Sequence, residues 1–285
     1  MSEVMAKPAP VLAIETLTLA LPALADRPHA VADVSLTIGA GETLCVVGES
    51  GSGKSMTGRA ILDLIPPPGI VTADRMIFRG QDLLTMDKRE RRKLRGRRIS
   101  MVMQDPKFSL NPVRTVGDQI AEAYRVHHKA SAREAKQRSL AMLEQVQIRE
   151  PGRVYDLYPH EVSGGMGQRV MIAMMLIAEP DILIADEPTS ALDVTVQLQI
   201  LKILDDLVTQ RGMGLIFISH DLRLVSSFCD RVLVMYAGRV VEEIEATRLH
   251  EAQHPYTRGL LECLPQIAAD RHPLPVLSRQ AEWKL

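Results

Sequence analysis

The sequence is poor in aromatic residues, which make up 4% of its 285 residues. No Phe, Tyr or Trp occurs before Phe78, so the N-terminal part of the chain offers no aromatic ring to a ligand. Cysteine is also scarce, because Cys45, Cys229 and Cys263 stand far apart and form no C-x-x-C pair. We therefore expect neither a disulfide framework nor a structural zinc site, and a reducing cytosolic compartment is the default.

Neither sign of charge is in excess, since 34 Lys and Arg residues and 35 Asp and Glu residues give a net charge of -1. A protein that mainly holds nucleic-acid phosphates usually carries a basic excess, so this class of function is not favoured. The longest apolar run, Val170 to Ala178, is far too short to span a bilayer, and the N-terminus lacks a signal-peptide pattern. We expect a soluble chain that does any membrane work through a partner.

The sequence does contain apolar strands that alternate with helical segments. Short alternating strands are predicted within 11–47, and a hairpin is predicted to turn at Ala237-Gly238. Continuous apolar runs at 43–48, 181–186 and 214–219 are typical of strands buried on both faces. Together with the helical patterns between them, these runs predict a mostly parallel sheet in an α/β fold.

The strongest motif is the glycine-rich octapeptide GESGSGKS between a predicted buried strand and a predicted helix. Its glycines let backbone N–H groups converge on a polyphosphate, and the N-terminus of the following helix favours the same anion. Lys54 is expected to reach the β- and γ-phosphates and the Ser55 hydroxyl to ligate Mg²⁺. A plain glycine turn is the weaker alternative in this context. The residues expected to bind nucleotide are Gly48, Glu49, Ser50, Gly51, Ser52, Gly53, Lys54, Ser55 and Met56.

A second motif, ILIADE, ends a predicted strand in two carboxylates. Asp186 is expected to hold Mg²⁺ through water, and Glu187 to orient or deprotonate the attacking water. Paired acids at a strand end can also be solvated loop charges, but the phosphate loop upstream favours the catalytic interpretation. The two motifs predict a P-loop nucleotide hydrolase.

Three further segments narrow this prediction. SGGMGQR opens a predicted helix with a capping Ser163 and exposed backbone donors, which makes a second anion site. One compact subunit cannot easily bring two glycine-rich helix ends to one γ-phosphate, so we expect another subunit to supply the second end. Gln104 and His220 each end a predicted strand and are candidate sensors of the γ-phosphate.

The order of these motifs resembles that of the ATP-binding cassette (ABC) ATPases, through GESGSGKS, MVMQDP, VSGGMGQR, ILIADEP, SALD and ISHD. The resemblance implies a P-loop NTPase fold with a RecA-like core, an antiparallel β-subdomain and an inserted α-helical subdomain at about 105–165. It also implies that two such domains sandwich two ATP molecules head to tail. Glu187, His220 and Gln104 would be catalytic, and Ser55, Gln104 and Asp186 would serve Mg²⁺. The residues facing the other subunit's ATP would be Ser163, Gly164, Gly165, Gln168 and Asp193.

Longer matches, including YPHEVSGGMGQRVMIAMMLIAEPDILIADEPTSALDVTVQLQIL and HPYTRGLLECLP, are similar to the peptide/nickel importer ATPases. The resemblance divides the chain into a nucleotide-binding domain, 1–250, and a short C-terminal extension, 251–285. It implies an ATPase at the cytoplasmic face of the inner membrane that powers import of a dipeptide, oligopeptide or nickel chelate.

The same resemblance implies the partners. They would be two transmembrane permease subunits, a second ABC ATPase subunit and, indirectly, a substrate-binding protein, with no nucleic acid. A short permease helix would dock in a groove formed by the Gln104–Asn111 loop and the helical subdomain. The alternative, a non-transport ABC ATPase acting mechanically on nucleic acid or ribosomes, generally needs a long insertion, a second cassette or a basic surface.

The chain departs from the family pattern in two places. An aromatic ring usually stacks on adenine, but the resemblance puts Leu21 at that position, so we expect weak base discrimination, with His29 a candidate to cover the base. Gly167 stands where this subfamily commonly has Arg, so we expect a less rigid site for the partner's ATP.

The stretch from Lys88 to Arg98 is predicted to be a solvated helix face, and His127 and His128 to be surface residues.

Overall fold

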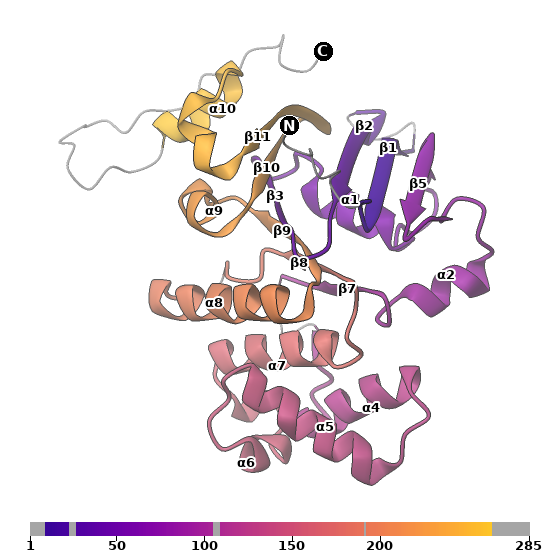
Figure 1. Ribbon diagram of the computed structural model, residues 1–285, viewed down its shortest axis with the longest axis vertical. Coiled ribbons are helices and arrows are strands. Elements are labelled where there is room, and N and C mark those ends of the chain that lie inside the picture. The colour runs from indigo at the N-terminus through magenta and orange to yellow at the C-terminus, as the bar shows by residue number, and fades with distance from the viewer. Residues whose placement is uncertain (1–8, 23–26, 105–108, 191, 264–285) are drawn as a thin grey trace, which may run out of the picture. The chain divides into compact units, whose positions relative to one another are not determined.

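The computed structural model describes residues 9–22, 27–104, 109–190 and 192–263. The chain divides into two units, the first made of Met1–Asp87 and Asp221–Leu285 and the second of Lys88–His220. Each unit has its own strands and helices (Figure 1). The domain limits expected from the sequence, 1–250 with a helical part near 105–165, differ from these units and stay a prediction. Most of the expected extension lies outside the described residues.

An antiparallel sheet in the first unit is built around its first strand, β1. The strand keeps its apolar side chains on one face, where Leu12, Ile14, Leu17 and Leu19 are buried. The step from Ile14 to Leu17 is three residues rather than two, which would turn the later side chains to the other face of the sheet. A bulge at Thr16, with φ of 55°, takes up the extra residue and keeps them on the same face. The strands, in the order β2-β1-β5-β6 with β4 on β1, are β1 (Leu12–Ala20), β2 (His29–Ile38), β4 (Ile70–Thr72), β5 (Arg75–Phe78) and β6 (Gln81–Asp82).

The first unit also contains a buried parallel pair of strands extended by a hairpin. All five residues of β3 are buried, as the continuous apolar run predicts, and β3 pairs in parallel with β10. The predicted hairpin is confirmed, because Ala237 and Gly238 have φ of 50° and 93° and join β10 to β11. The elements are β3 (Thr43–Val47), α1 (Lys54–Ile61), α9 (Leu222–Phe228), β10 (Arg231–Tyr236), β11 (Arg239–Glu245), η2 (Ala246–Glu251) and α10 (Pro255–Glu262).

The second unit combines three parallel strands with a group of helices. The strands are buried and β8 lies between β7 and β9, so the predicted mostly parallel α/β fold is confirmed. Figure 1 shows α4, α5, α6 and α7 packed together as a helical subdomain. The elements are α2 (Lys88–Leu94), β7 (Ile99–Val102), α4 (Val116–His127), α5 (Ala132–Gln145), α6 (Pro151–Tyr155), η1 (Pro159–Glu161), α7 (Gly164–Leu176), β8 (Ile182–Asp186), α8 (Val194–Arg211) and β9 (Gly214–Ser219).

Side-chain caps explain where the long helices of the second unit begin. A hydroxyl or carboxylate oxygen accepts a hydrogen bond from the backbone N–H three residues later at the start of four helices. The exposed helix α2 has no buried residue, which confirms the predicted solvated face. The four capping residues are Thr115, Ser131, Ser163 and Asp193.

The expectation that His127 and His128 are surface residues needs correction. His127 and His128 are half-buried rather than at the surface, because His128 stacks on Tyr124 with ring centroids 4.5 Å apart. Burial lowers the pKa of His127. Cys45 and Cys229 are far apart in the sequence but are neighbours in the first unit. Burial raises the pKa of Cys45, and the hydrogen bond with Cys229 raises it further.

The packing of α4 on α6 depends on the absence of a side chain at Gly117. A Cβ on Gly117 would lie 2.1 Å from the Tyr155 ring, whereas a Cβ on Gly152 would meet nothing within 4 Å. We expect Gly117→Ala to lower the unfolding free energy by about 1–3 kcal/mol through overpacking. The matched change Gly152→Ala should leave it unchanged or raise it slightly, because alanine is the better helix former. Urea denaturation measures both, and equal effects would contradict this packing.

Candidate nucleotide site

The predicted phosphate loop lies in the first unit and packs backbone against backbone. A Cβ on Gly48, which has φ of 149°, would lie 2.1 Å from the carbonyl oxygen of Met235. A Cβ on Gly53, with φ of 106°, would lie 2.7 Å from the carbonyl oxygen of Ala30. No side chain fits at either position without displacing a strand, so the sequence needs glycine at both.

Lys54 lies across this loop and is 6% exposed. Its Nζ donates to the carbonyl oxygens of Gly48 at 2.8 Å and Glu49 at 2.9 Å. Since Lys54 is the first residue of α1, backbone N–H groups of the helix N-terminus and the ammonium group belong to one short stretch of chain. The loop therefore combines a cation with backbone donors, the groups that hold a polyphosphate.

Tyr256 has a role at the phosphate loop that no sequence motif predicts. This residue is fully buried, and its hydroxyl oxygen accepts a hydrogen bond from the Glu49 backbone N–H at 3.1 Å. Its ring meets that of Tyr236 with centroids 4.5 Å apart. The helix α10 thus supports the start of the phosphate loop. In the sequence, the only signal for this segment is its HPYT match to the peptide/nickel importer ATPases.

In the second unit, the structure brings three predicted residues together at the ends of β7, β8 and β9. Gln104 Nε2 donates to Glu187 Oε2 at 3.0 Å, and His220 Nδ1 lies 3.3 Å from Glu187 Oε1. Asp186, the last residue of β8, is buried with 4% exposure. Both oxygens of the Glu187 carboxylate are therefore held by neighbouring side chains. Such fixed orientation is what a carboxylate needs if it is to act on a water molecule.

Glu187 has an unusual backbone conformation, with φ of 46°. The strained residue is held by its N–H, which donates to the Ile218 carbonyl oxygen at 3.0 Å. Its own carbonyl oxygen accepts from the Ser190 hydroxyl at 3.2 Å. Left-handed conformations of non-glycine residues are concentrated at functional sites, so this strain supports a functional role for the carboxylate.

The predicted second anion site lies at the N-terminus of α7, also in the second unit. Ser163 caps the helix through its hydroxyl oxygen, which accepts from Met166 N at 3.4 Å. Gly165 packs against Val196, where an added Cβ would lie 2.9 Å from a methyl carbon. Ser163 and Gly165 open onto a cavity of about 590 Å³ between α7, α8 and residues 147–149. Gln168 is 2% exposed, so it lies inside the fold rather than at the surface.

The phosphate loop and the Glu187 cluster belong to different units. Their predicted meeting around one nucleotide stays a prediction, as do the catalytic and binding roles of the individual residues. Asp193 caps α8, with Oδ1 accepting from Val196 N at 3.0 Å. Among the residues that the structure describes, no helix combines the length and apolar character needed to cross a bilayer.

Comparisons with known proteins show which family the chain belongs to. A family model described as ABC transporter matches residues 31–190. The dipeptide transport ATP-binding protein DppD of Escherichia coli is 48% identical over 86% of this chain and 76% of DppD. The probable peptide ABC transporter ATP-binding protein y4tR of Sinorhizobium fredii is 50% identical over 83% of this chain and 71% of y4tR. The glutathione import ATP-binding protein GsiA of Shigella dysenteriae is 47% identical over 91% of this chain, which spans only 43% of GsiA.

Solved structures agree with the fold. The dimeric ATP-binding cassette MJ0796, in a post-hydrolysis state bound to ADP and Pi, is 27% identical with a TM-score of 0.73, over 82% of this chain and 98% of that one. The cassette cbiO1 of Clostridium perfringens, part of the ABC transporter complex cbiONQ, is 27% identical with a TM-score of 0.71, over 85% of this chain and 91% of that one. The expected P-loop type of α/β fold is confirmed.

The Glu187 cluster generates a prediction about hydrolysis. Glu187→Gln keeps the hydrogen-bonding shape but removes the base, so ATP hydrolysis should fall by about 10²–10⁴-fold while ATP binding persists. The control is Glu179→Gln, which changes an exposed glutamate of the same unit that also has positive φ, 55°. Phosphate release and nucleotide titration measure the two effects. Hydrolysis by Glu187→Gln at the unmodified rate would show that another group is the base.

Proposed function

Because this chain belongs to the ABC transporter family and is an ATPase, we propose that it is the subunit whose ATP hydrolysis powers the import of small peptides. The relatives DppD, y4tR and GsiA support this choice of substrate, since they are named for dipeptide, peptide and glutathione transport. They favour the peptide side of the expected choice between peptides and nickel chelates. The observation that carries the proposal is the 48% identity with DppD over 86% of the chain.

In the proposed mechanism, the phosphate loop and the Glu187 cluster act on one ATP. The loop N–H groups and Lys54 would hold the β- and γ-phosphates. Glu187 would take a proton from the water that attacks the γ-phosphorus, and ADP would leave. Gln104 and His220 would fix the carboxylate while it does so, a role that their contacts at 3.0 and 3.3 Å support.

The residues expected to serve Mg²⁺ fit that ion. Ser55, Gln104 and Asp186 offer hydroxyl, amide and carboxylate oxygen atoms, the hard ligands that Mg²⁺ prefers beside phosphate and water. The buried Asp186 carboxylate at the end of β8 has the charge and position for this role. A bound Mg²⁺ would neutralise charge on the β- and γ-phosphate oxygens.

A second ATPase subunit is part of the proposal. Ser163 and Gly165 present the N-terminus of α7 to a cavity of about 590 Å³ rather than to the protein interior. We propose that this surface receives the ATP of a second cassette in a head-to-tail dimer. Gly164 lies between Ser163 and Gly165, and Asp193 caps α8, whose Val196 packs on Gly165. The dimeric form of MJ0796 supports this arrangement. The partner cassette is identical or a related chain.

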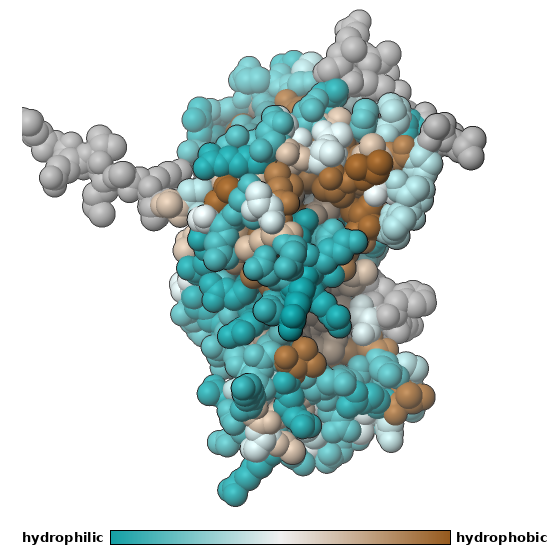
Figure 2. Space-filling model, turned by 90° about the vertical axis from the view of Figure 1, so that its right-hand side faces the viewer, coloured by the Kyte–Doolittle hydropathy of each residue, from teal (hydrophilic) through white to brown (hydrophobic). Residues whose placement is uncertain are grey.

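The docking site for the permease pair is proposed on the second unit, around the turn that precedes α4. Two exposed apolar side chains flank the Gln104–Asn111 loop, Met103 at 38% and Val113 at 78% exposure. On the face drawn in Figure 2, hydrophilic side chains dominate and apolar ones gather in small groups. Exposed apolar side chains on such a surface suit a partner with an apolar contact face, here a short permease helix at the cytoplasmic side of the inner membrane.

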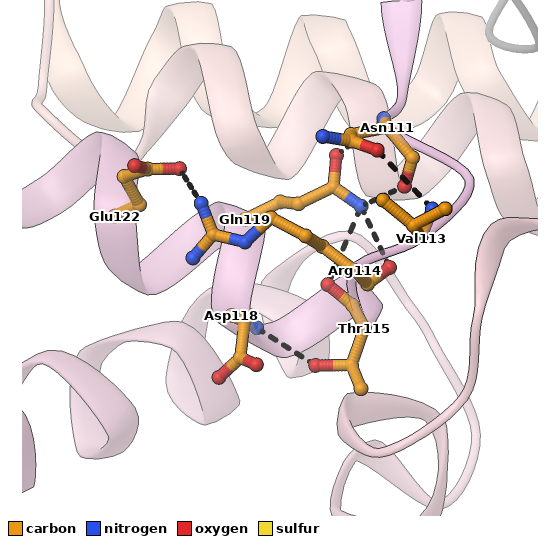
Figure 3. Close-up of polar contacts among 7 residues, drawn as sticks. All are labelled: Asn111, Val113, Arg114, Thr115, Asp118, Gln119 and Glu122. Atoms are coloured by element: carbon orange, nitrogen blue, oxygen red, sulfur yellow. Dashed lines mark hydrogen bonds and ion pairs between the residues drawn. The ribbon is translucent and has the colours of Figure 1, made fainter.

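The turn that carries Val113 is fixed by one side chain of α4 (Figure 3). Gln119 Oε1 accepts from Asn111 N at 2.8 Å, and Gln119 Nε2 donates to the carbonyl oxygens of Asn111 at 3.0 Å and Arg114 at 3.1 Å. Val113 N donates to Asn111 Oδ1 at 3.1 Å. Arg114 pairs with Glu122 and lines an open groove of about 910 Å³ on the helical subdomain. The turn thus holds Val113 outward beside this groove. A turn fixed in this way is suited to transmit force between the subunit and a docked permease helix.

The docking proposal predicts that charge at Val113 uncouples the subunit from its permease. Val113→Glu should weaken association with the membrane pair, while ATP hydrolysis by the isolated subunit is retained. Ile70→Glu is the matched control, because Ile70 is an exposed apolar residue, at 62%, of the first unit. Co-purification from detergent measures association. Unchanged recovery of the permease with Val113→Glu would exclude this surface.

The function itself is tested in proteoliposomes that contain this chain, its permease pair and the matching substrate-binding protein. We expect dipeptides bound to that protein to stimulate ATP hydrolysis and to enter the vesicles, and the Glu187→Gln variant to do neither. A nickel chelate supplied in the same way is the discriminating ligand. Stimulation by the chelate, with none by peptides, would assign the subunit to the other substrate class.

A further inference from the structure

We propose that Arg27 is a further nucleotide-binding residue, which contacts the phosphate groups of ATP at the rim of the phosphate loop. This inference rests on the proposed function only in taking the loop as the ATP site. Arg27 lies in the first unit, just before β2, and is half-buried. One of its terminal nitrogens, NH2, donates to the carbonyl oxygen of Gly51, inside the loop, at 2.5 Å.

The segment that carries Arg27 is seated on the loop independently of this contact. The Ala30 carbonyl oxygen approaches both Gly53 and Gly238 so closely that an added Cβ would lie 2.7 and 2.9 Å from it. Gly238 N in turn donates to the Ser52 carbonyl oxygen at 2.9 Å. Arg27 therefore extends from a backbone already fixed against the loop, and its reach to Gly51 follows from that position.

A second fixed point lies at Pro28, the residue that directly follows Arg27. Leu21 N donates to the Pro28 carbonyl oxygen at 2.9 Å, and Ala20 pairs with His29 at the end of β1 and β2. These contacts close the base of the connection between the two strands next to Arg27. The backbone that directly follows Arg27 is therefore fixed at Pro28 and again at Ala30.

The contact of Arg27 resembles that of Lys54, the residue for which the loop motif predicts phosphate binding. Each cation donates to carbonyl oxygens of the loop: Lys54 to Gly48 and Glu49, and Arg27 to Gly51. A carbonyl oxygen is a weaker partner for a cation than a phosphate oxygen, which carries charge. A guanidinium has five N–H donors in a planar fork, so Arg27 can keep Gly51 and still bind a phosphate oxygen.

Arg27 also compensates for the lack of an aromatic ring at the position of Leu21. Leu21 has no ring to stack on a base, and His29 is exposed. Contacts to the phosphates are shared by every nucleoside triphosphate, so a loop that gains affinity through Arg27 binds ATP and GTP with similar strength. The alternative role for Arg27 is a brace that only ties the strand connection to the loop.

The experiment compares Arg27→Gln and Arg27→Lys in the full chain carrying Glu187→Gln, so that nucleotide is not consumed. Calorimetry gives the Kd for MgATP, MgGTP and inorganic tripolyphosphate. We expect Arg27→Gln to raise all three Kd values by a similar factor, roughly tenfold, as for the loss of one hydrogen bond to a charged group. Arg27→Lys, which keeps the charge, should have a smaller effect. Arg75→Gln, at an exposed arginine of the same unit, should have none.

Three results would overturn the proposal. Unchanged Kd values with a lowered thermal midpoint would make Arg27 a brace only. A loss confined to ATP and GTP, with tripolyphosphate binding intact, would put the contact on the nucleoside. If Arg27→Gln does not fold, the same titrations on Arg27→Met, which keeps the length of the side chain without its charge, decide the matter, and Kd values equal to those of the parent would overturn the proposal. Because binding is measured on the isolated chain, a failure of peptide transport leaves this result standing, and the two proposals fail separately.

Discussion

Close packing of backbone on backbone around the phosphate loop is the constraint on which the first unit's site depends. The carbonyl oxygens of Met235 and Ala30 occupy the places where side chains of Gly48 and Gly53 would stand. The hairpin at Ala237-Gly238 brings one strand to this contact, and Tyr256 supports the loop from α10. The loop conformation is therefore set by the fold before any ligand binds, which is how a polar site avoids a reorganisation cost.

The second unit uses a different device for the same purpose. Its key group, Glu187, follows a fully buried strand and adopts a strained conformation that the Ile218 carbonyl oxygen and Ser190 hold in place. Gln104 and His220 then occupy the two carboxylate oxygens. Rigid strands supply the position and the strain sets the direction of the side chain. The proposed phosphate cradle is made of backbone and the proposed general base is a side chain, so the two need different kinds of support.

Local pattern predicted much of this protein, because the chemistry lies where buried strands end. The run TLCVV leading into the loop, the run ILIAD before Glu187 and the Ala237-Gly238 turn were all readable from composition and period. The contacts Arg27–Gly51, Tyr256–Glu49 and Cys45–Cys229 were not, since they join residues far apart in the sequence. Half-burial of His127 was not predicted either, because it depends on Gly96, far away in the sequence, where an added Cβ would lie 2.7 Å from His127 Nε2.

The lack of aromatic residues before Phe78 affects how the nucleotide can be held. Stacking of a base on an aromatic ring is worth about 1–3 kcal/mol, and a hydrogen bond to a charged group about 1.5–3 kcal/mol. One guanidinium on the phosphates can therefore replace the affinity that a ring at Leu21 would give. It cannot replace the selectivity, because phosphates are the same in every nucleotide. A subunit that hydrolyses ATP acts on the γ-phosphate, so affinity weighted toward the phosphates serves that reaction without a ring.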